Sequence, residues 1–472
     1  MPKVSLTLVI CTFRRDEFVL RNLCGLKDAG VLGKDIEVLV IDNSGDGELS
    51  AKIGEMEHVR VIPQQNLGGA GGFTRGIYEV ARNHGAASAA NSEEHPEPYI
   101  LLMDDDIEFE PEVIRRTLSL LEKSDGRTCI SGQLFNIYPP HELFEAGATF
   151  GERKPFDWKV LLETVSSDDL SQWEKHSKNH PIDYGGWWYF CFPLRAVAEV
   201  GLPLPLFIRG DDVDYGRRLV DAGYRIVSPE GIGVRHETFD ARYGTWVFYY
   251  ETRNCLILLA TSYRFRGWGE KQIWEFIEHS VLKDLSRFDY GRAALKLEAI
   301  RDFLTGPNSL ERSDLRHPLI VGLYEQYSLK APSVDPFEGK RIDLEKSPRK
   351  NLIQRLTSIA LRALGPLSRI MLPKKHVLLC GPVFTSRRIP FNTKSILFEH
   401  TLSGKSYYFE YSAKHAKAFQ AELSHTKKYW DQSYLTAAQS WKDAMPTLSS
   451  FGYWGRVFGS KPIPDSPAPK CQ

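Results

Sequence analysis

The first hundred residues alternate between short apolar runs and segments with helical spacing, and this alternation constrains the fold more than any other feature. Residues 4–11, 36–41 and 59–62 predict buried strands, and residues 17–26 predict a helix between the first two. Another buried strand is predicted at residues 99–103. Such alternation predicts an α/β fold with a parallel sheet whose ligands bind at the carboxyl ends of the strands.

The chain of 472 residues is too long for one ordinary hydrophobic core. We expect a Rossmann-like α/β domain over residues 1–245, a helical extension over 246–330 and a smaller C-terminal region over 351–472. A stretch rich in Pro, Lys, Asp and Ser, residues 328–349, predicts a linker before that last region.

Beyond Trp246 the pattern is mainly helical, most clearly in residues 246–263 and 271–285. The C-terminal region shows strand-like runs at 377–379 and 407–411 and a helix near 413–423. We therefore expect a helical and mixed C-terminal part.

Charge and cysteine content exclude several classes of protein. The 60 basic and 60 acidic residues balance, which argues against a nucleic-acid binder. The seven cysteines are scattered and odd in number, which fits a reducing cytoplasm better than a disulfide framework. The start of the chain lacks a signal-peptide pattern, and no run of about 18 apolar residues predicts a membrane span. We expect a cytoplasmic protein that is soluble or peripheral to a membrane.

An acidic triplet, Asp104-Asp105-Asp106, directly follows the strand predicted at residues 99–103. Residues i and i+2 of an extended chain point to the same side, so Asp104 and Asp106 can approach one ion together. His236 follows another strand-like run and is a candidate third ligand at a sheet edge. Two hard oxygen ligands and an imidazole suit Mn²⁺ or Mg²⁺. The alternative for the triplet is a solvated acidic turn, and a lone histidine is usually structural.

Polar residues after the first two predicted strands suggest a nucleotide pocket. Asp42 begins an Asp-Asn-Ser sequence at the end of the second strand, where a carboxylate can accept a hydrogen bond from a base. A plain Asx turn explains this sequence equally well. Thr12 and Arg14 follow the first strand and would help to wrap the base and diphosphate.

A glycine-rich stretch runs from Asn66 to Gly72 and includes Gly69. Glycines let backbone N–H groups approach a ligand, and Arg75 lies within the helix predicted from about Phe73, where it could meet a phosphate. The alternative is a flexible loop. The stretch is no Walker loop, because no Gly-Lys-Ser/Thr follows it.

Two further motifs carry candidate chemistry. Trp187 and Trp188 follow a glycine pair, and paired indoles suit stacking on the apolar face of a sugar, although aromatic residues are more often core residues. Asp211 and Asp212 open a predicted helix, where they could cap it or take part in catalysis. We favour Asp212 as a general base and Asp211 as a residue that orients the acceptor or the loop.

At these motifs the chain resembles inverting glycosyltransferases of the GT-A fold, and more narrowly the polymerising galactofuranosyltransferases of bacterial cell walls. The matching stretches are spread over about two hundred residues in one order, namely residues 66–75, 102–107, 183–188, 202–215, the His236 segment and 249–254.

The resemblance implies that Asp104, Asp106 and His236 hold the metal, that Asp212 is the base and that the two tryptophans contact the sugar. We place Asp105 with the nucleotide-binding residues. Two departures from the family stand out. Its polymerising members carry a β-sandwich before the transferase domain, whereas this chain starts at the first strand. Gly210 stands where the family has a tryptophan before the aspartate pair, so acceptor recognition is expected to differ.

From the resemblance we expect metal-dependent transfer of galactofuranose from UDP-galactofuranose to a glycan or lipid-linked glycan acceptor, in synthesis of cell-envelope polysaccharide. The rivals are transfer from a rhamnosyl or hexopyranosyl donor, a sugar-phosphate nucleotidyltransferase, and a non-catalytic glycan-binding scaffold. Residues 351–375 carry apolar and basic residues at helical spacing and no acidic residue. They predict a helix that either lies on an anionic membrane surface or packs on the protein. The oligomeric state is open, a homo-oligomer included.

Overall fold

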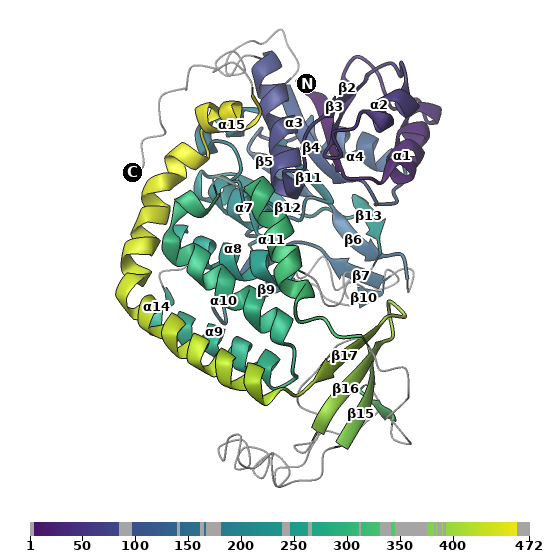
Figure 1. Ribbon diagram of the computed structural model, residues 1–472. Helices are drawn as coiled ribbons and strands as arrows, with labels where there is room; N and C mark the ends of the chain where they lie inside the picture. The colour runs from purple at the N-terminus through teal and green to yellow at the C-terminus, as the bar shows by residue number, and fades with distance from the viewer. Residues whose placement is uncertain are drawn as a thin grey trace.

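The computed structural model describes residues 4–84, 97–138, 142–160, 165–166, 181–237, 246–262, 267–310, 313–330, 341–344, 375–381, 384, 389 and 393–459. At its centre lies a seven-stranded sheet in the order β12-β5-β11-β4-β1-β2-β3 (Figure 1). Its strands are β1 (Val4–Thr12), β2 (Ile36–Asp42), β3 (Val59–Pro63), β4 (Glu97–Asp104), β5 (Thr128–Ser131), β11 (Tyr189–Pro193) and β12 (Arg225–Val227).

The four predicted strands are confirmed as β1 to β4, but the sheet is mixed rather than parallel. β11 runs antiparallel to both of its neighbours, β4 and β5, while the other pairs are parallel. A parallel pair needs a crossover to return the chain to the same end of the sheet. The chain between β5 and β11 instead passes through a second sheet and enters β11 from the opposite end.

Helices cover both faces of the central sheet, which explains why its strands read as continuous apolar runs. Leu8 and Ile10 of β1 pack on one face with α1 (Asp16–Asp28), α2 (Glu48–Ile53) and α4 (Glu112–Leu121). Val9 packs on the other face with α3 (Gly68–His84), α7 (Asp211–Asp221) and the C-terminal α15 (Phe451–Val457). The short α6 (Arg195–Val200) contributes to this second face.

The glycine-rich stretch forms the start of α3 rather than a loop, so the expected helix start near Phe73 was wrong. Gly68 has a φ of +71°, and the helix begins there. A Cβ on Gly72 would lie 2.2 Å from Cys11 Sγ, and one on Gly76 would lie 2.2 Å from Val9 Cγ1. These two glycines therefore allow the helix to pack closely against β1.

A second, separate sheet has four strands in the order β10-β7-β6-β13. Its strands are β6 (Gln133–Asn136), β7 (Glu142–Glu145), β10 (Val165–Ser166) and β13 (Gly233–His236), and the hairpin β8 (Ala148–Phe150) and β9 (Trp158–Val160) follows β7. Backbone hydrogen bonds between Glu108 and Arg235 tie β13 to the chain that leaves β4. These bonds bring the last residue of β13, His236, beside the acidic triplet.

The helical segments predicted at 246–263 and 271–285 are confirmed as α8 (Val247–Thr261) and α9 (Glu270–Leu285). They share a core with α10 (Tyr290–Thr305) and α14 (Ala413–Leu448). The helix α11 (Ser313–Glu325) and the 3-10 turn Pro307–Leu310 complete this extension. Helix α14 has 36 residues and extends far beyond the predicted segment, because Trp430 and Trp441 continue its buried face.

A third sheet, in the order β14-β15-β16-β17, packs against the helical core. It contains β14 (Arg341–Asp343), β15 (Lys375–Gly381), β16 (Thr393–His400) and β17 (Ser406–Glu410). The strand-like runs at 377–379 and 407–411 are therefore confirmed in essence. β14 lies inside residues 328–349, the stretch predicted to be a linker. That prediction was therefore wrong at Arg341–Asp343. Residues 351–374 lie outside the described residues.

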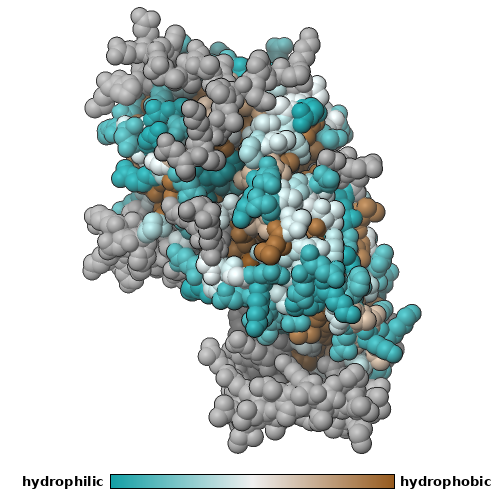
Figure 2. All heavy atoms as spheres, turned by 90° about the vertical axis from the view of Figure 1, so that its left-hand side faces the viewer, coloured by the Kyte–Doolittle hydropathy of each residue, from teal (hydrophilic) through white to brown (hydrophobic). Residues whose placement is uncertain are grey.

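The end of the chain returns to the central sheet. In Figure 1, α14 (yellow) runs from the third sheet to α15, which lies beside α3. There the Trp454 indole Nε1 donates a hydrogen bond to the Pro203 carbonyl at 2.9 Å. Seen from the side of α14, small hydrophobic patches are scattered among hydrophilic residues (Figure 2). Among the described helices, none combines the length and apolar character that crossing a membrane requires.

Candidate active site

Three side chains with metal-ligating atoms meet at the carboxyl ends of β4 and β13. Asp104 is the last residue of β4, Asp106 follows two residues later, and His236 is the last residue of β13. One ligand atom from each lies within 4.8 Å of the others. His236 Nε2 and Asp106 Oδ1 are 3.1 Å apart. The structure thus brings together the three residues that the sequence singled out as metal ligands.

The electrostatics of this cluster favour a bound cation. Burial raises the pKa of Asp104 to about 7, and the negative charge of Asp106 adds to the effect. Burial alone would lower the pKa of His236, but the hydrogen bond and charge of Asp106 outweigh it and raise the pKa. The raised pKa of His236 shows that the negative charge of the carboxylates favours a positive charge here, whereas the raised pKa of Asp104 mainly reflects the cost of burying its charge. Two carboxylates and an imidazole form a donor set that fits Mn²⁺ or Mg²⁺.

Asp105 is buried and joins the acidic triplet to the end of β1. Its Oδ2 accepts a hydrogen bond from the Thr12 hydroxyl at 2.7 Å, and its Oδ1 accepts one from Arg15 Nη1 at 3.2 Å. Arg15 also forms an ion pair with Asp106. Arg14, the predicted ligand contact, is exposed and lies over the Phe13 ring instead. The arginine that meets the acidic triplet is thus the neighbour of the one the sequence favoured.

The end of β2 combines both interpretations of its Asp-Asn-Ser sequence. Asp42 Oδ1 accepts a hydrogen bond from the Ser44 backbone N–H at 2.9 Å, which is the expected Asx turn. Asp42 Oδ2 is buried and has no hydrogen-bond partner among the described residues. A buried carboxylate oxygen without a donor fits a ligand N–H. Asn43 donates to the Gly68 carbonyl at 3.1 Å and so joins this pocket to the start of α3.

The start of α3 is fixed by local and long-range contacts. Asn66 Oδ1 accepts a hydrogen bond from the Gly68 N–H at 2.9 Å. A Cβ on Gly69 would lie 4.0 Å from Asp211 Oδ2, so α3 begins beside the aspartate pair. Direct contacts of Asn66 and Gly69 with a nucleotide stay predictions.

Arg75 has two contacts within the protein. It forms an ion pair with Glu79 at 2.9 Å and lies 4.9 Å from the centroid of the Phe458 ring. Glu79 is fully buried, and Phe458 belongs to the returning C-terminal segment. Arg75 therefore joins α3 to the C-terminal segment, and its contact with a phosphate stays a prediction.

The two tryptophans also differ from expectation, because they are core residues. Trp187 is 5% exposed and packs edge-to-face on Phe73 and Tyr215. Trp188 is 8% exposed, and its indole Nε1 donates to the Gly132 carbonyl at 3.1 Å. Their burial disfavours an open stacking platform, and contact with a sugar stays a prediction.

Asp211 and Asp212 open α7 after Gly210, whose φ of +83° turns the chain into the helix. Burial and the neighbouring Asp212 raise the pKa of Asp211 well above its usual value. Burial also raises the pKa of Asp212, to about 6, although its Oδ1 accepts a hydrogen bond from the Val213 N–H. A carboxylate of this kind is ionised at neutral pH and more basic than an aspartate in water, as a general base requires.

The loop before this pair is strained and firmly held. Phe207 and Arg209 both have positive φ, at 72° and 67°, which is uncommon for residues other than glycine. Buried side chains of α8 hold the loop: Arg253 donates to the Leu206 carbonyl at 2.9 Å, and Asn254 donates to the Arg209 carbonyl at 2.7 Å. The family-like motif at 249–254 therefore acts by positioning the aspartate pair.

Glu145, at the end of β7, was not among the predicted catalytic or binding residues, although residues 143–147 loosely resemble the acceptor-side segment of the family. It is 4% exposed, and its Oε1 has no hydrogen-bond partner in the described part of the chain. Burial raises its pKa to about 8, and the charge of Asp212 contributes. Glu145 is therefore mostly protonated at neutral pH, and it lies close enough to Asp212 for the charge of Asp212 to raise its pKa.

Comparison with known proteins agrees with this geometry. Residues 2–253 match the family described as "Glycosyltransferase like family 2". The chain belongs to this family. Family membership and a mixed α/β sheet with helices on both faces agree with the GT-A fold that the resemblance implied.

Two curated relatives of this glycosyltransferase family member are galactofuranosyltransferases from Mycolicibacterium smegmatis. GlfT2 is 27% identical over 331 residues, which cover 65% of this chain and 48% of the relative. GlfT1 is 28% identical over 224 residues, which cover 46% of this chain and 65% of the relative. The chain thus spans about half the length of GlfT2.

Two solved structures resemble this chain only distantly. The mannosyltransferase PcManGT from Pyrobaculum calidifontis, in complex with GDP-Man and Mn²⁺, has a TM-score of 0.36 and 10% identity, covering 69% of this chain and 88% of that protein. The S. aureus protein TarS has a TM-score of 0.38 and 10% identity, covering 69% of this chain and 53% of that protein.

Proposed function

We propose that this protein is an inverting, metal-dependent galactofuranosyltransferase that uses UDP-galactofuranose and a glycan or lipid-linked glycan acceptor. The observation that carries the proposal is the convergence of Asp104, Asp106 and His236 within 4.8 Å. The negative charge of Asp104 also raises the pKa of Asp211, the residue before the candidate base Asp212. A metal-binding group and a general base within electrostatic reach are what transfer from a nucleotide diphosphate requires.

The metal would be held by Asp104, Asp106 and His236. When bound, Mn²⁺ or Mg²⁺ supplies a Lewis acid that neutralises charge on the diphosphate leaving group. The chain's own cation near this group is Arg15, which is paired with Asp105 and Asp106 and can stabilise the same charge. Asp42, with its buried free oxygen, supports recognition of a base N–H.

Asp212 takes the proton of the acceptor hydroxyl. Its pKa of about 6 leaves it ionised at neutral pH, yet it accepts a proton more readily than an ordinary aspartate. The attacking oxygen would approach the sugar from the face opposite the diphosphate, which inverts the anomeric centre. Glu145, protonated beside Asp212, can donate a hydrogen bond to the acceptor without adding a second negative charge.

Galactofuranose as the donor sugar rests on similarity to GlfT2 and GlfT1, both named galactofuranosyltransferases. The test is a donor panel of UDP-galactofuranose, UDP-galactopyranose, UDP-glucose and dTDP-rhamnose, each assayed with Mn²⁺ for transfer to short galactofuranose-containing acceptors and for hydrolysis. Turnover with UDP-galactofuranose that is lost in Asp212→Asn supports the proposal. Turnover only with a non-furanose donor would refute the galactofuranose assignment while keeping the glycosyltransferase activity.

The acceptor and location follow from the same proposal. Envelope glycans are built on lipid carriers, so an enzyme on the cytoplasmic face of the membrane would meet its acceptor there. Residues 351–375, the proposed basic amphipathic helix, are the segment suited to such peripheral contact. Most of this segment lies outside the described residues, and its role stays a proposal.

A further inference from the structure

The loop of residues 206–210, which leads into the aspartate pair, is supported by helices that the family match does not reach. Phe207, Arg209 and Gly210 in this loop all have positive φ. A backbone conformation of this kind costs free energy and persists only where surrounding contacts fix it. The family match ends within α8, whereas α10 and α11 lie beyond it. The contacts of these two helices with the loop therefore bear on how the candidate base is positioned.

A buried arginine of α8, Arg253, forms the inner end of this support. Its Nη2 donates a hydrogen bond to the Leu206 carbonyl at 2.9 Å, and its Nη1 donates to the Tyr249 hydroxyl at 3.4 Å. Both Arg253 and Tyr249 are fully buried. A buried guanidinium is costly unless acceptors and negative charge offset its lost hydration. The position of the Leu206 carbonyl therefore depends on how Tyr249 holds Arg253.

Asp302 of α10 connects Tyr249 to the helical extension. The Tyr249 hydroxyl donates a hydrogen bond to Asp302 Oδ2. Arg316 of α11 donates to both oxygens of the same carboxylate, each at 2.9 Å. Such a bidentate pair fixes the orientation of a carboxylate. Asp302 therefore brings a firmly held negative charge to the hydroxyl that Arg253 also contacts.

A second contact from α11 reaches the same loop. The ring of Phe207 stacks on the rings of Tyr250 and His317, at centroid distances of 4.9 and 4.8 Å. The Tyr250 hydroxyl and His317 Nδ1 are 3.2 Å apart. His317 directly follows Arg316 in the chain. One turn of α11 thus supports the loop both through hydrogen bonds and through ring stacking.

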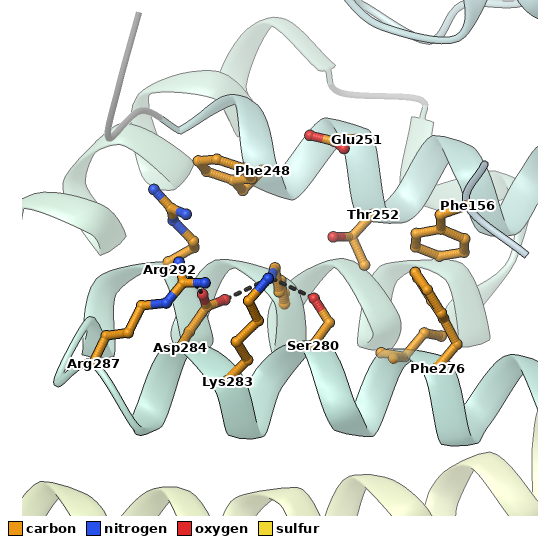
Figure 3. Close-up of a pocket in the computed structure, with 12 residues that line it drawn as sticks. Phe156, Phe248, Glu251, Thr252, Phe276, Ser280, Lys283, Asp284, Arg287 and Arg292 are labelled. Carbon is orange, nitrogen blue, oxygen red and sulfur yellow. Dashed lines mark hydrogen bonds and ion pairs between the residues drawn. The ribbon is translucent and has the colours of Figure 1, made fainter. Parts of the chain in front are cut away.

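A different face of α8 has no part in this support. Phe248 and Thr252, four residues apart, line a cavity of about 210 Å³ between α8, α9 and α10 (Figure 3). Arg253 lies one position further around the helix and contacts the loop instead. Within the cavity, Asp284 forms a buried ion pair with Lys296 at 2.5 Å. In the described part of the chain this pair makes no hydrogen bond to the loop, so it offers a matched control.

We propose that Asp302 and Arg316 are positioning residues for the candidate base Asp212. They act through Tyr249 and Arg253 on the loop that precedes the base. A small displacement of a general base slows proton transfer strongly, so loss of these contacts should lower kcat more than it weakens donor binding. The inference rests on the proposed role of Asp212 and gives a function to helices beyond the family match.

The experiment compares Asp302→Asn, Tyr249→Phe and the double variant. Asp302→Asn removes the charge that pairs with Arg316, whereas Tyr249→Phe removes only the hydroxyl and keeps that ion pair. In transfer assays with UDP-galactofuranose and Mn²⁺, each should lower kcat about tenfold and change the donor KM by less than about twofold. Both variants interrupt one connection, so the double variant should be no more than about twofold slower than the worse single variant.

A second measurement does not depend on the reaction. Hydrogen exchange followed by mass spectrometry should show faster exchange of the backbone amides of residues 206–210 in Asp302→Asn and Tyr249→Phe. The matched control is Asp284→Asn, which breaks a buried ion pair of the same helical extension. It should leave kcat and the exchange of the loop within about twofold of the wild type, even where its unfolding temperature falls.

Several results would overturn the proposal. These are unchanged kcat and unchanged loop exchange in Asp302→Asn and Tyr249→Phe, fully additive losses in the double variant, or equal losses in Asp284→Asn. If Asp302→Asn fails to fold, Tyr249→Phe carries the test alone, because its ion pair is intact. Faster loop exchange in the variants of a protein that transfers no sugar from the donor panel would count against the proposed function only.

Discussion

Replacement of Asp212 by asparagine should slow catalysis and stabilise the fold at the same time. Burial moves the pKa of this carboxyl from 3.8 to about 6, and each pKa unit corresponds to about 1.4 kcal/mol. Keeping Asp212 ionised in the folded protein therefore costs about 3 kcal/mol relative to the unfolded chain. Asparagine has nearly the same shape and no charge, so Asp212→Asn avoids that cost.

The pH dependence has a definite sign. The folded protein binds the Asp212 proton more tightly than the unfolded chain does, so the free energy of unfolding falls as pH rises from about 4 to about 6 and is constant above. The gain from Asp212→Asn should be about 3 kcal/mol at pH 7.5 and about half of that at pH 5. Catalysis needs the ionised form, so kcat/KM of the wild type should fall through about pH 6, to roughly a tenth at pH 5.

The measurements are urea unfolding followed by tryptophan fluorescence at the two pH values, and initial transfer rates over the same range. Asp212→Asn should lower the transfer rate about a hundredfold or more while donor binding in calorimetry survives. The control is Asp214→Asn on the same helix, which breaks a 2.7 Å ion pair with Arg218 and should destabilise the fold by about 3 kcal/mol. If Asp212→Asn were as unstable as the control, or if donor binding were lost with turnover, the assignment of Asp212 as a buried base facing the acceptor would be incorrect.

Further variants test other parts of the site. Asp106→Ala should abolish metal-dependent turnover with little change in unfolding temperature, and His236→Ala should weaken Mn²⁺ binding to a smaller degree; full activity in EDTA would disprove a metal role. Glu145→Gln should retain most activity at pH 7, because the native carboxyl is already protonated there, whereas Glu145→Ala should lose at least tenfold; equal losses in both would contradict a protonated Glu145. Gly68→Ala should unfold at a clearly lower temperature, because its Cβ would lie 2.0 Å from a backbone oxygen and its φ is positive; an unchanged melting curve would contradict the described start of α3. Liposome flotation with anionic lipid at low salt should capture the chain through residues 351–375 and release it at high salt; no flotation would make that segment structural.

Local sequence pattern was sufficient to predict the strands that carry the candidate active site. The continuous apolar runs of β1, β2 and β4 are typical of strands in a sheet covered on both faces. The spacing of Asp104 and Asp106 follows from the two-residue period at the end of such a strand. Both are properties of neighbours in the chain, so they could be predicted without tertiary structure.

Where a side chain lies relative to distant segments could not be predicted in this way. Arg75 has the spacing of a phosphate ligand, yet a residue from the far end of the chain, Phe458, packs against it. Trp187 and Trp188 are buried by contacts with segments distant in the sequence. The antiparallel direction of β11 was likewise signalled by no local pattern. The direction of β11 depends on the path of the chain through a second sheet.

The sequence by itself determined the α/β framework, the acidic triplet and the candidate base at the start of a helix. Only the tertiary structure decided that His236 reaches Asp106 across 130 residues and that Glu145 lies near Asp212. The tertiary structure also decided how readily these carboxyl groups ionise. Burial raises the pKa values of Asp104 and Asp212, and many segments of the chain together bury them. Periodicity reports which face of an element is apolar, whereas reactivity depends on what the other elements bring against that face.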